Sequence, residues 1–281
     1  MKLLDMLKDS IRMLCSPRLQ SQLRLLYVTR QVIKSQNFHE PEMALLKSLV
    51  QAGDHVADIG ANVGAYTKEF SRLVGASGHV YSFEPISENF NILQTVIRKA
   101  NLMNVDPIYA ALGSISEQRQ MVIPESRAFT GFYLAHLAQP GDQGRRMTVD
   151  VLTLDELWKK SRLKDLDFIK CDVEGGELEV LRGGLQLIES QRPGWLLEVS
   201  RETSGEVFRS LQALGYKAFV YRDTLVQTDS YRDKEFSNYF FFHPSSKIWN
   251  RAAPLTTEGT RQCCVPSVVS GDTRFQIFER G

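Results

Sequence analysis

The segment VADIGANVGAYT, residues 56–67, decides the fold of this chain. Its first four residues, 56–59, are mostly apolar and have the character of a buried strand, and a helical pattern begins near Gly64. Glycines at 60 and 64 permit positive φ angles and let the backbone approach a ligand closely. Ligands of open parallel sheets bind outside the carboxyl ends of the strands. The segment therefore predicts a strand, a ligand-binding turn and a helix.

Strand and helix patterns alternate along the chain beyond this segment. The expected strands are residues 79–83, 105–112, 167–171, 195–199, 217–221 and 239–242. The expected helices are residues 87–100, 154–160, 177–190 and 205–214. Such βαβ repetition with nearly continuous apolar strands predicts an α/β fold with a doubly wound, mostly parallel sheet. The alternation stops at residues 113–149, where we expect an insertion that forms a β-ribbon.

The chain divides into three parts. Residues 1–39 form a predicted N-terminal helical extension, in which Ser16-Pro17 has the pattern of a helix start after a first helix over 2–15. Residues 40–243 form the predicted main domain, and residues 244–281 a C-terminal tail.

Composition excludes several classes of protein. The net charge of +1 over 281 residues argues against broad neutralisation of phosphates, so no nucleic-acid partner is expected. The four cysteines form no CxxC pair, which favours reduced thiols in a cytosolic protein. Charged residues interrupt the N-terminus and no long apolar stretch is present, so we expect no membrane span and a cytoplasmic location. The oligomeric state stays open, with a homodimer as one option.

A second motif lies about 20 residues beyond the glycine turn. The expected strand 79–83 ends in Phe-Glu-Pro, which places Glu84 and Pro85 at its carboxyl end. A carboxylate in this position can accept hydrogen bonds from both ribose hydroxyls of a nucleotide. Together with the glycine turn, it predicts a cofactor that contains a nucleoside.

The residues of the turn favour S-adenosylmethionine over a dinucleotide. A dinucleotide fold needs GxGxxG, whereas Asn62 here occupies the position of the middle glycine and Thr67 that of the third. A bulkier turn suits a ligand without pyrophosphate. Asp58, at the tip of the strand, could accept a hydrogen bond from the ammonium group of such a ligand. The alternative is that Asp58 and Asn62 only cap the turn.

Another glycine-rich turn follows the expected strand 167–171. Asp172 and Glu174 would face the reactive end of the cofactor there, and we predict both as catalytic, with Asp172 also in the cofactor site. A carboxylate in this place can orient or deprotonate a substrate hydroxyl, or hold a divalent metal that acidifies it. The sequence leaves the metal open. The alternative is that Asp172 caps the next helix and Glu174 favours its positive end.

Three further residues are candidates for this chemistry. Glu198 lies in the apolar strand 195–199, where an unpaired charge would be costly, so it points to the cleft or pairs with a base. His136 lies in the insertion and His243 just beyond the last strand, and either could serve as a base; the alternative is that both histidines are incidental.

These motifs, in this order, resemble the FkbM-type methyltransferases. The resemblance rests on residues 58–67, 83–85, 151–155, 169–175, 179–183 and 238–241, and covers roughly residues 40–243. Cys171 and Gly176 depart slightly from the family pattern. The resemblance implies a Rossmann-like class I methyltransferase fold, a seven-stranded sheet whose last strand is antiparallel, and S-adenosylmethionine as cofactor. The cofactor site that it implies comprises Asp58, Gly60, Asn62, Gly64 and Glu84, bordered by Asp172 and Glu174.

From this resemblance we expect O-methylation of a hydroxyl on a sugar, another glycan or a small secondary metabolite. A nicotinamide-dependent oxidoreductase is the first alternative, and the incomplete glycine pattern argues against it. A non-catalytic scaffold is the second, and the intact Asp58, Gly60, Gly64 and Glu84 argue against it. RNA or protein as acceptor is the third, and the near-neutral charge makes it less favourable.

Overall fold

The computed structural model describes residues 16–34, 41–124, 132, 134–139, 141–232 and 235–257. The predicted helix over 2–15, residues 125–131 of the insertion and the end of the chain after residue 257 lie outside this part.

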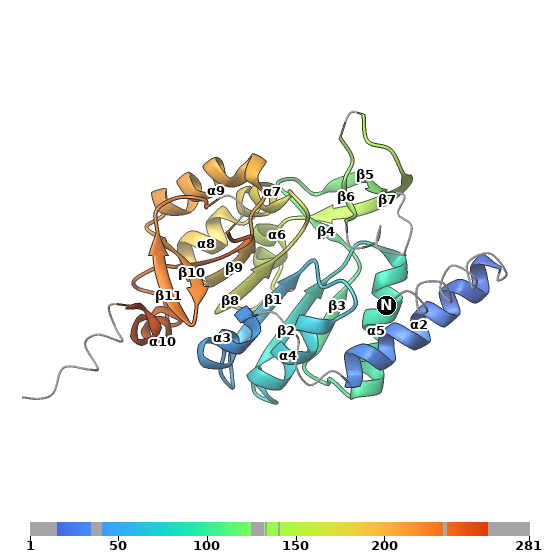
Figure 1. Ribbon diagram of the computed structural model, residues 1–281, viewed down its shortest axis with the longest axis horizontal. Coiled ribbons are helices and arrows are strands. Elements are labelled where there is room, and N and C mark those ends of the chain that lie inside the picture. The colour runs from blue at the N-terminus through green and yellow to red at the C-terminus, as the bar shows by residue number, and fades with distance from the viewer. Residues whose placement is uncertain are drawn as a thin grey trace, which may run out of the picture.

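One eight-stranded sheet forms the centre of the molecule (Figure 1). Its strands, in spatial order, are β11 (Thr224–Thr228), β10 (Lys217–Arg222), β12 (Asn238–Phe242), β9 (Gly194–Glu198), β8 (Phe168–Cys171), β1 (His55–Ile59), β2 (His79–Phe83) and β3 (Val105–Ile108). Neighbours from β9 to β3 are parallel, and β12 is antiparallel to both of its neighbours. The predicted sheet with an antiparallel last strand is confirmed. An eighth strand, β11, which the sequence did not predict, adds an antiparallel edge beside β10.

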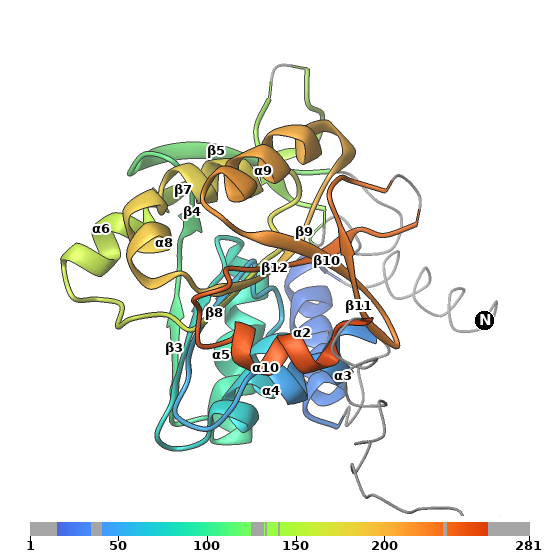
Figure 2. The same cartoon turned by 90° about the vertical axis from the view of Figure 1, so that its left-hand side faces the viewer.

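Helices cover both faces of this sheet (Figure 2). On one face lie α3 (Pro41–Leu49), α4 (Ala65–Val74), α5 (Ser87–Ala100) and α10 (Trp249–Ala252), the last followed by a short 3-10 helix at Ala253–Leu255. On the other face lie α6 (Leu154–Lys159), α7 (Glu177–Arg182), α8 (Leu185–Gln191) and α9 (Arg201–Ala213). Because the central strands are apolar on both sides, each face buries its own hydrophobic cluster. The doubly wound α/β class is thereby confirmed.

A second, four-stranded sheet stands beside the first. Its order is β4 (Ala111–Leu112), β7 (Arg145–Leu152), β5 (Glu117–Ile123) and β6 (His136–Leu137). β5 and β7 pair in an antiparallel manner along their whole length, which is the ribbon predicted for the insertion. The prediction of one continuous strand over 105–112 is wrong, because these residues form two strands, β3 and β4, which belong to different sheets. Pro107 fits β3 as an edge strand, since proline has no N–H to donate to a further neighbour.

The expected helix 177–190 is likewise two helices, α7 and α8, separated at Gly183 and Gly184. A β-carbon on Gly183 would stand 1.9 Å from the carbonyl oxygen of Gly113. The chain leading into the insertion therefore passes against the end of α7, and only glycine leaves room for it.

The described part of the N-terminal extension is the helix α2 (Pro17–Lys34), which packs along α5 (Figure 1). It begins as predicted, since the amide of Leu19 donates to Ser16 Oγ at 3.4 Å and proline takes the first helical position. Among the described residues, no helix combines the length and the apolar composition that crossing a bilayer requires.

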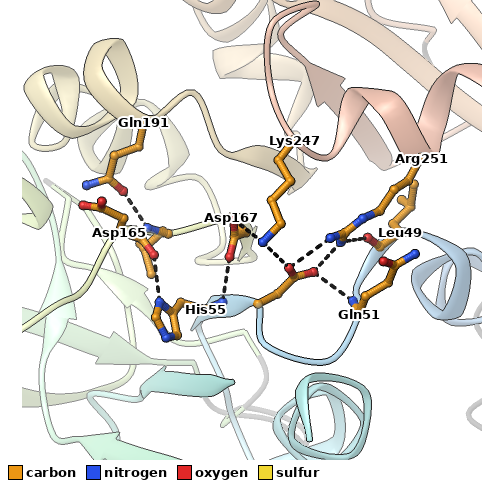
Figure 3. Close-up of polar contacts among 10 residues, drawn as sticks. Leu49, Gln51, His55, Asp165, Asp167, Gln191, Lys247 and Arg251 are labelled. Atoms are coloured by element: carbon orange, nitrogen blue, oxygen red, sulfur yellow. Dashed lines mark hydrogen bonds and ion pairs between the residues drawn. The ribbon is translucent and has the colours of Figure 1, made fainter. Parts of the chain in front are cut away.

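The C-terminal segment is fastened to the amino end of β1 by ion pairs (Figure 3). The carboxylate of Asp54 is fully buried and contacts the guanidinium of Arg251 through both oxygens. Lys247 Nζ lies 2.8 Å from Asp54 Oδ1 and 3.1 Å from Asp167 Oδ1. Asp167 in turn accepts a hydrogen bond from the amide of His55 at 2.9 Å. Residues 247–251 thus close the edge of the sheet that lies opposite the carboxyl ends of β1 and β8.

Candidate active site

Three predicted motifs meet along one edge of the main sheet. The last residues of β1, β2 and β8 lie beside one another in the strand register. The turn after β1 is tied to β2, because the amides of Gly60 and Ala61 donate to the carbonyl of Phe83 at 3.0 and 2.9 Å. Parallel strands therefore bring this turn, Glu84 and Asp172 to the same place.

Gly60 is the point where the turns after β1 and β8 touch. Its φ is +78°, and a β-carbon there would stand 1.8 Å from the carbonyl oxygen of Asp172. The conformation and the lack of space both exclude a side chain. Asn62 also adopts a left-handed φ of 52°, which asparagine tolerates better than most residues.

A cavity opens directly outside these strand ends. It encloses about 820 Å³ when the solvent space of its open mouth is included. The predicted site residues in its wall are Gly60, Asn62, Glu84, Pro85, Asp172 and Glu174. The insertion contributes the apolar side chains of Met121, Phe132, Ala135 and Leu137. The cavity therefore has a polar wall at the sheet edge and an apolar wall from the second sheet.

Glu84 is held rigidly in this wall. Only 4% of it is exposed, and its two oxygens accept hydrogen bonds from the amides of Asn62 and Ile86, each at 2.8 Å. Burial raises the pKa of Glu84 to about 7, although these two amides act in the opposite direction. The side chain of Asn89 makes a third hydrogen bond to this carboxylate, which leaves one lone pair for a further donor. Glu84 is thus a fixed acceptor at the end of β2.

Asn62 presents an unsatisfied acceptor beside Glu84. Its Oδ1 is buried and has no hydrogen-bond partner, and the residue lines the cavity. Buried polar atoms of this kind are rare in folded proteins and call for a ligand or water. Since Asn62 Oδ1 contacts no backbone amide, its side chain does not cap the turn.

Asp58 and Gly64 lie behind the cavity and are absent from its wall. Asp58 is fully buried, with Oδ2 accepting from Thr67 Oγ1 at 2.6 Å and Oδ1 without a partner. Burial raises the pKa of Asp58. A β-carbon on Gly64 would stand 2.7 Å from Leu93 Cδ1, so this glycine allows α4 to pack on α5. Direct contact of either residue with a cofactor stays a prediction.

Lys170 is a residue of this site that sequence reasoning did not single out. It is 6% exposed, its Nζ lies 3.0 Å from Asp172 Oδ2, and it stands 4.6 Å from the ring centre of Tyr66. Burial alone would lower the pKa of Lys170, but the charges of Asp172 and Asp58 outweigh burial and raise that pKa. A lysine within the otherwise apolar strand β8 was the signal that could have found it.

Asp172 connects Lys170 to Glu198 at the end of β9. Burial alone would raise the pKa of Asp172, but Lys170 outweighs it and holds that pKa below its ordinary value. Glu198 lies beside Asp172 at the ends of the neighbouring strands β9 and β8 and lines the cavity, as its place in an apolar strand predicted. Helix α7 begins after Gly176 without any side-chain cap, so Asp172 does not serve as its cap.

Glu174 lies at the exposed rim of the cavity with a left-handed φ of 52°. Burial, followed by the charge of Asp172, raises the pKa of Glu174. His136 is close enough to affect that pKa, but its ring is engaged by Asp142 Oδ2 at 3.1 Å and the carbonyl of Leu134 at 2.9 Å. The histidine does not line the cavity, so it is not placed as a base there.

Asn89, in the first turns of α5, links the cavity to the N-terminal helix. It is 1% exposed and makes a side-chain hydrogen bond with Glu84. Its Nδ2 donates to the carbonyl of Phe132 at 3.2 Å, and its Oδ1 accepts from Arg24 Nη2 at 2.7 Å. The Arg24 guanidinium also stands 4.4 Å from the centre of the Phe132 ring. Helix α2 thereby braces one wall of the cavity, which no local sequence pattern indicated.

Within the described ranges, no group of three or more His, Cys, Asp or Glu side chains is arranged to hold a metal ion.

Parts of this chain are similar in sequence to known proteins. Residues 58–218 match the family model described as the methyltransferase FkbM domain. The hexuronic acid methyltransferase AglP of Haloferax volcanii is 27% identical over 146 residues, which are 52% of this chain and 56% of that protein. A probable cobalt-precorrin-6B C(15)-methyltransferase (decarboxylating) of Saccharolobus solfataricus is 37% identical over 62 residues, 22% of this chain and 31% of that protein. The chain thus spans about half of one curated relative and a third of the other.

A crystal structure of a methyltransferase FkbM from Methylobacillus flagellatus KT aligns with a TM-score of 0.48 and 16% identity, covering 78% of this chain and 59% of that one. The family match covers more than half of the present chain and includes the turns after β1, β2 and β8. The chain therefore belongs to the FkbM family of S-adenosylmethionine-dependent methyltransferases.

Proposed function

We propose that this protein transfers the methyl group of S-adenosylmethionine to a hydroxyl oxygen of a sugar, another glycan or a small secondary metabolite. The observation that carries the proposal is Glu84, a buried carboxylate held by two backbone amides in the wall of the cavity. Its position at the end of β2 is the one from which a carboxylate binds both hydroxyls of a ribose.

The residues around Glu84 fit such a cofactor. The orphaned Oδ1 of Asn62 can accept a hydrogen bond from the amino-acid portion or the nucleoside of the cofactor. Gly60 leaves the backbone bare where the ligand would pass. Asp58, buried behind the turn, adds negative charge that favours a cationic ligand.

The carboxyl groups on the same wall of the cavity support a hydroxyl group as the methyl acceptor. When bound, the cofactor supplies an electrophilic methyl group, and the protein aligns the acceptor and removes its proton. Asp172 lines the cavity in an ionised state favoured by Lys170, which suits it to orient or deprotonate a hydroxyl. The relative from Haloferax volcanii is named a hexuronic acid methyltransferase, and this name favours a sugar acceptor.

Calorimetric titration with S-adenosylhomocysteine, NAD and NADP tests the cofactor. We expect S-adenosylhomocysteine alone to bind, and Glu84→Ala to abolish that binding while the variant keeps its thermal unfolding transition. Binding of a nicotinamide cofactor alone would replace the proposal with an oxidoreductase. If none of the three ligands bound, a non-catalytic scaffold protein would be favoured.

Methyl transfer from labelled S-adenosylmethionine to a panel of hydroxylated sugars, uronic acids and glycans tests the acceptor. We expect label on an oxygen, identified by the NMR shift of the product methyl group. Label on nitrogen or carbon would contradict O-methylation and leave the cofactor assignment in place.

A further inference from the structure

The carboxyl groups of Asp172 and Glu198 form a pair that requires one proton. Each lines the cavity, and they follow paired positions of the neighbouring parallel strands β8 and β9, in which Cys171 lies beside Leu197. Two carboxyl groups that share a site repel each other when both are ionised, so the pKa of one of them rises and that member keeps its proton. Its partner must then be the ionised member.

The surroundings decide which member holds the proton. Lys170 contacts Asp172 at 3.0 Å and has Asp58 as a second anionic neighbour. Its positive charge therefore stabilises those two carboxylates more than it stabilises Glu198. Burial, followed by the charge of Asp172, raises the pKa of Glu198 to about 8, whereas the pKa of Asp172 is lowered. The shared proton therefore resides on Glu198 near neutral pH.

Other charged groups also act on this pair. They are Lys170 from β8 and Asp58 from β1, Glu174 and Glu177 after β8, and His136 from β6, which acts on Glu174. Among the pair's neighbours so named, Lys170 is the cation that acts on it directly, and it is already engaged with Asp172. A second positive charge in the cavity would thus act mainly on the protonated member.

We propose that Glu198 is a catalytic residue, which with Asp172 forms a carboxyl pair that releases its shared proton when a cation enters the cavity and recovers a proton from the acceptor hydroxyl. This inference rests on the proposed function and deepens it. A positive charge within about 6 Å of a carboxyl group strengthens its ionisation by roughly 100-fold. A sulfonium cofactor bound at such a distance would therefore shift the pair toward its fully ionised state, and a neutral thioether would not.

The balance of the reaction matches this cycle. The acceptor oxygen forms a bond to the methyl carbon, the bond between that carbon and sulfur breaks with its electron pair left on sulfur, and the hydroxyl proton passes to the pair. The cavity loses one positive charge at the same moment as the pair loses one negative charge. The resting state, with one proton shared by Asp172 and Glu198, is thereby restored.

Proton counting by calorimetry tests the inference without any acceptor. The full chain is titrated at pH 7 with S-adenosylmethionine and with S-adenosylhomocysteine, each in phosphate and in Tris buffer, which differ in ionisation enthalpy. We expect the sulfonium ligand to release between about half a proton and one proton more than the thioether, as a pKa near 8 moved by about two implies. The difference in heat between the two buffers measures this number directly.

Glu198→Gln removes the titrating group while its amide can still donate to Asp172. Both ligands should still bind this variant, and the difference in released protons should vanish. Glu202→Gln is the matched control, because Glu202 is an exposed residue in the first turn of α9 and its loss should leave the difference intact.

Three outcomes would overturn the inference. Equal proton release by both ligands in the wild-type chain would contradict it and leave the proposed function standing. A difference that persists in Glu198→Gln would assign the proton to another group. Failure of the folded chain to bind either ligand would overturn the proposed function and this inference together.

Discussion

The backbone of Gly60 passes the carbonyl group of Asp172 so closely that a β-carbon on residue 60 would stand 1.8 Å from that oxygen. The glycine turn after β1 and the acidic turn after β8 therefore pack backbone to backbone. The amide of Asp172 also donates to the carbonyl of Ile59 at 3.0 Å, which fixes the same two segments from the other side. The glycine turn after β1 and the acidic turn after β8 are thus one structural unit, so a substitution that displaces one turn should also displace the other.

Gly60→Ala should therefore do more than introduce an unfavourable φ. An alanine at φ +78° costs roughly 1 to 2 kcal/mol in conformation, and the overlap with Asp172 adds to this. We expect a clear loss of thermal stability and at least about 10-fold weaker binding of S-adenosylhomocysteine. Gly175→Ala is the control, since φ is +91° there but nothing lies within 4 Å of the added carbon. Equal effects of the two changes would show that the contact with Asp172 is unimportant.

Glu84→Gln should weaken S-adenosylhomocysteine binding by about 10- to 100-fold, the range for hydrogen bonds to a charged group. Glutamine offers one acceptor oxygen in place of two, so it cannot accept from Asn62, Ile86 and a ribose together. Calorimetry measures the affinity. Glu88→Gln should leave it nearly unchanged, because Glu88 bonds to Ser87 and Arg145 and is absent from the cavity wall.

Asn89→Ala should reduce both stability and cofactor affinity, because it leaves the carbonyl of Phe132 and the guanidinium of Arg24 without this buried partner. We expect a loss of about 1 to 3 kcal/mol in the free energy of unfolding and a several-fold weaker affinity for S-adenosylhomocysteine. Chemical denaturation and calorimetry measure the two. Asn91→Ala, at an exposed position of the same helix, should change neither.

Arg251→Met should destabilise the fold far more than Lys247→Met. Asp54 is fully buried, and loss of Arg251 removes contacts with both of its oxygens, at a cost of about 3 to 5 kcal/mol. The Lys247 side chain is 54% exposed and leaves Arg251 in place, so its loss should cost under about 1 kcal/mol. Urea denaturation of the two variants provides the comparison, and similar losses would contradict a dominant role for Arg251.

The same ion pair should make the protein sensitive to acid. Burial alone would raise the pKa of Asp54, but Arg251 and Lys247 outweigh it and lower that pKa. A lowered pKa in the folded state contributes stability above the ordinary value of 3.8, and this contribution disappears as the pH falls through the folded pKa. The difference in stability between wild type and Arg251→Met should therefore narrow in acid, because protonated Asp54 no longer needs the guanidinium.

Glu84 and Glu198 should make the protein less stable at high pH, which is the opposite of the effect of Asp54. Their pKa values rise from 4.5 to about 7 and about 8, chiefly through burial. A raised pKa contributes stability that is complete below the unfolded value and is lost as the pH rises through the folded value. The melting temperature of the ligand-free protein should thus fall between about pH 6 and pH 9. Glu198→Gln should flatten the upper part of this decline, and an unchanged profile would contradict the raised pKa.

Much of the fold follows from the sequence because its signals are local. Apolar strands such as 56–59 and 168–171 alternate with amphipathic helices, and this alternation permits little other than a doubly wound sheet. Parallel strands place their carboxyl ends at one edge, so Gly60, Glu84 and Asp172 could be assigned to one site from their positions after strands. The outlines of the insertion and of helix α2 were likewise readable from local patterns.

Only the tertiary structure decided which side chains contact one another. Asn89 joins Glu84 to Arg24 and Phe132, although 65 residues separate Arg24 from Asn89, and Asp54 meets Arg251 across 197 residues. Asp58, one residue before the end of β1, is fully buried and does not line the cavity. Composition and periodicity determine which face of an element is buried, but the partner of a buried polar group depends on how distant segments pack. The sequence therefore determined where the site is, and the packing determined which charges act within it.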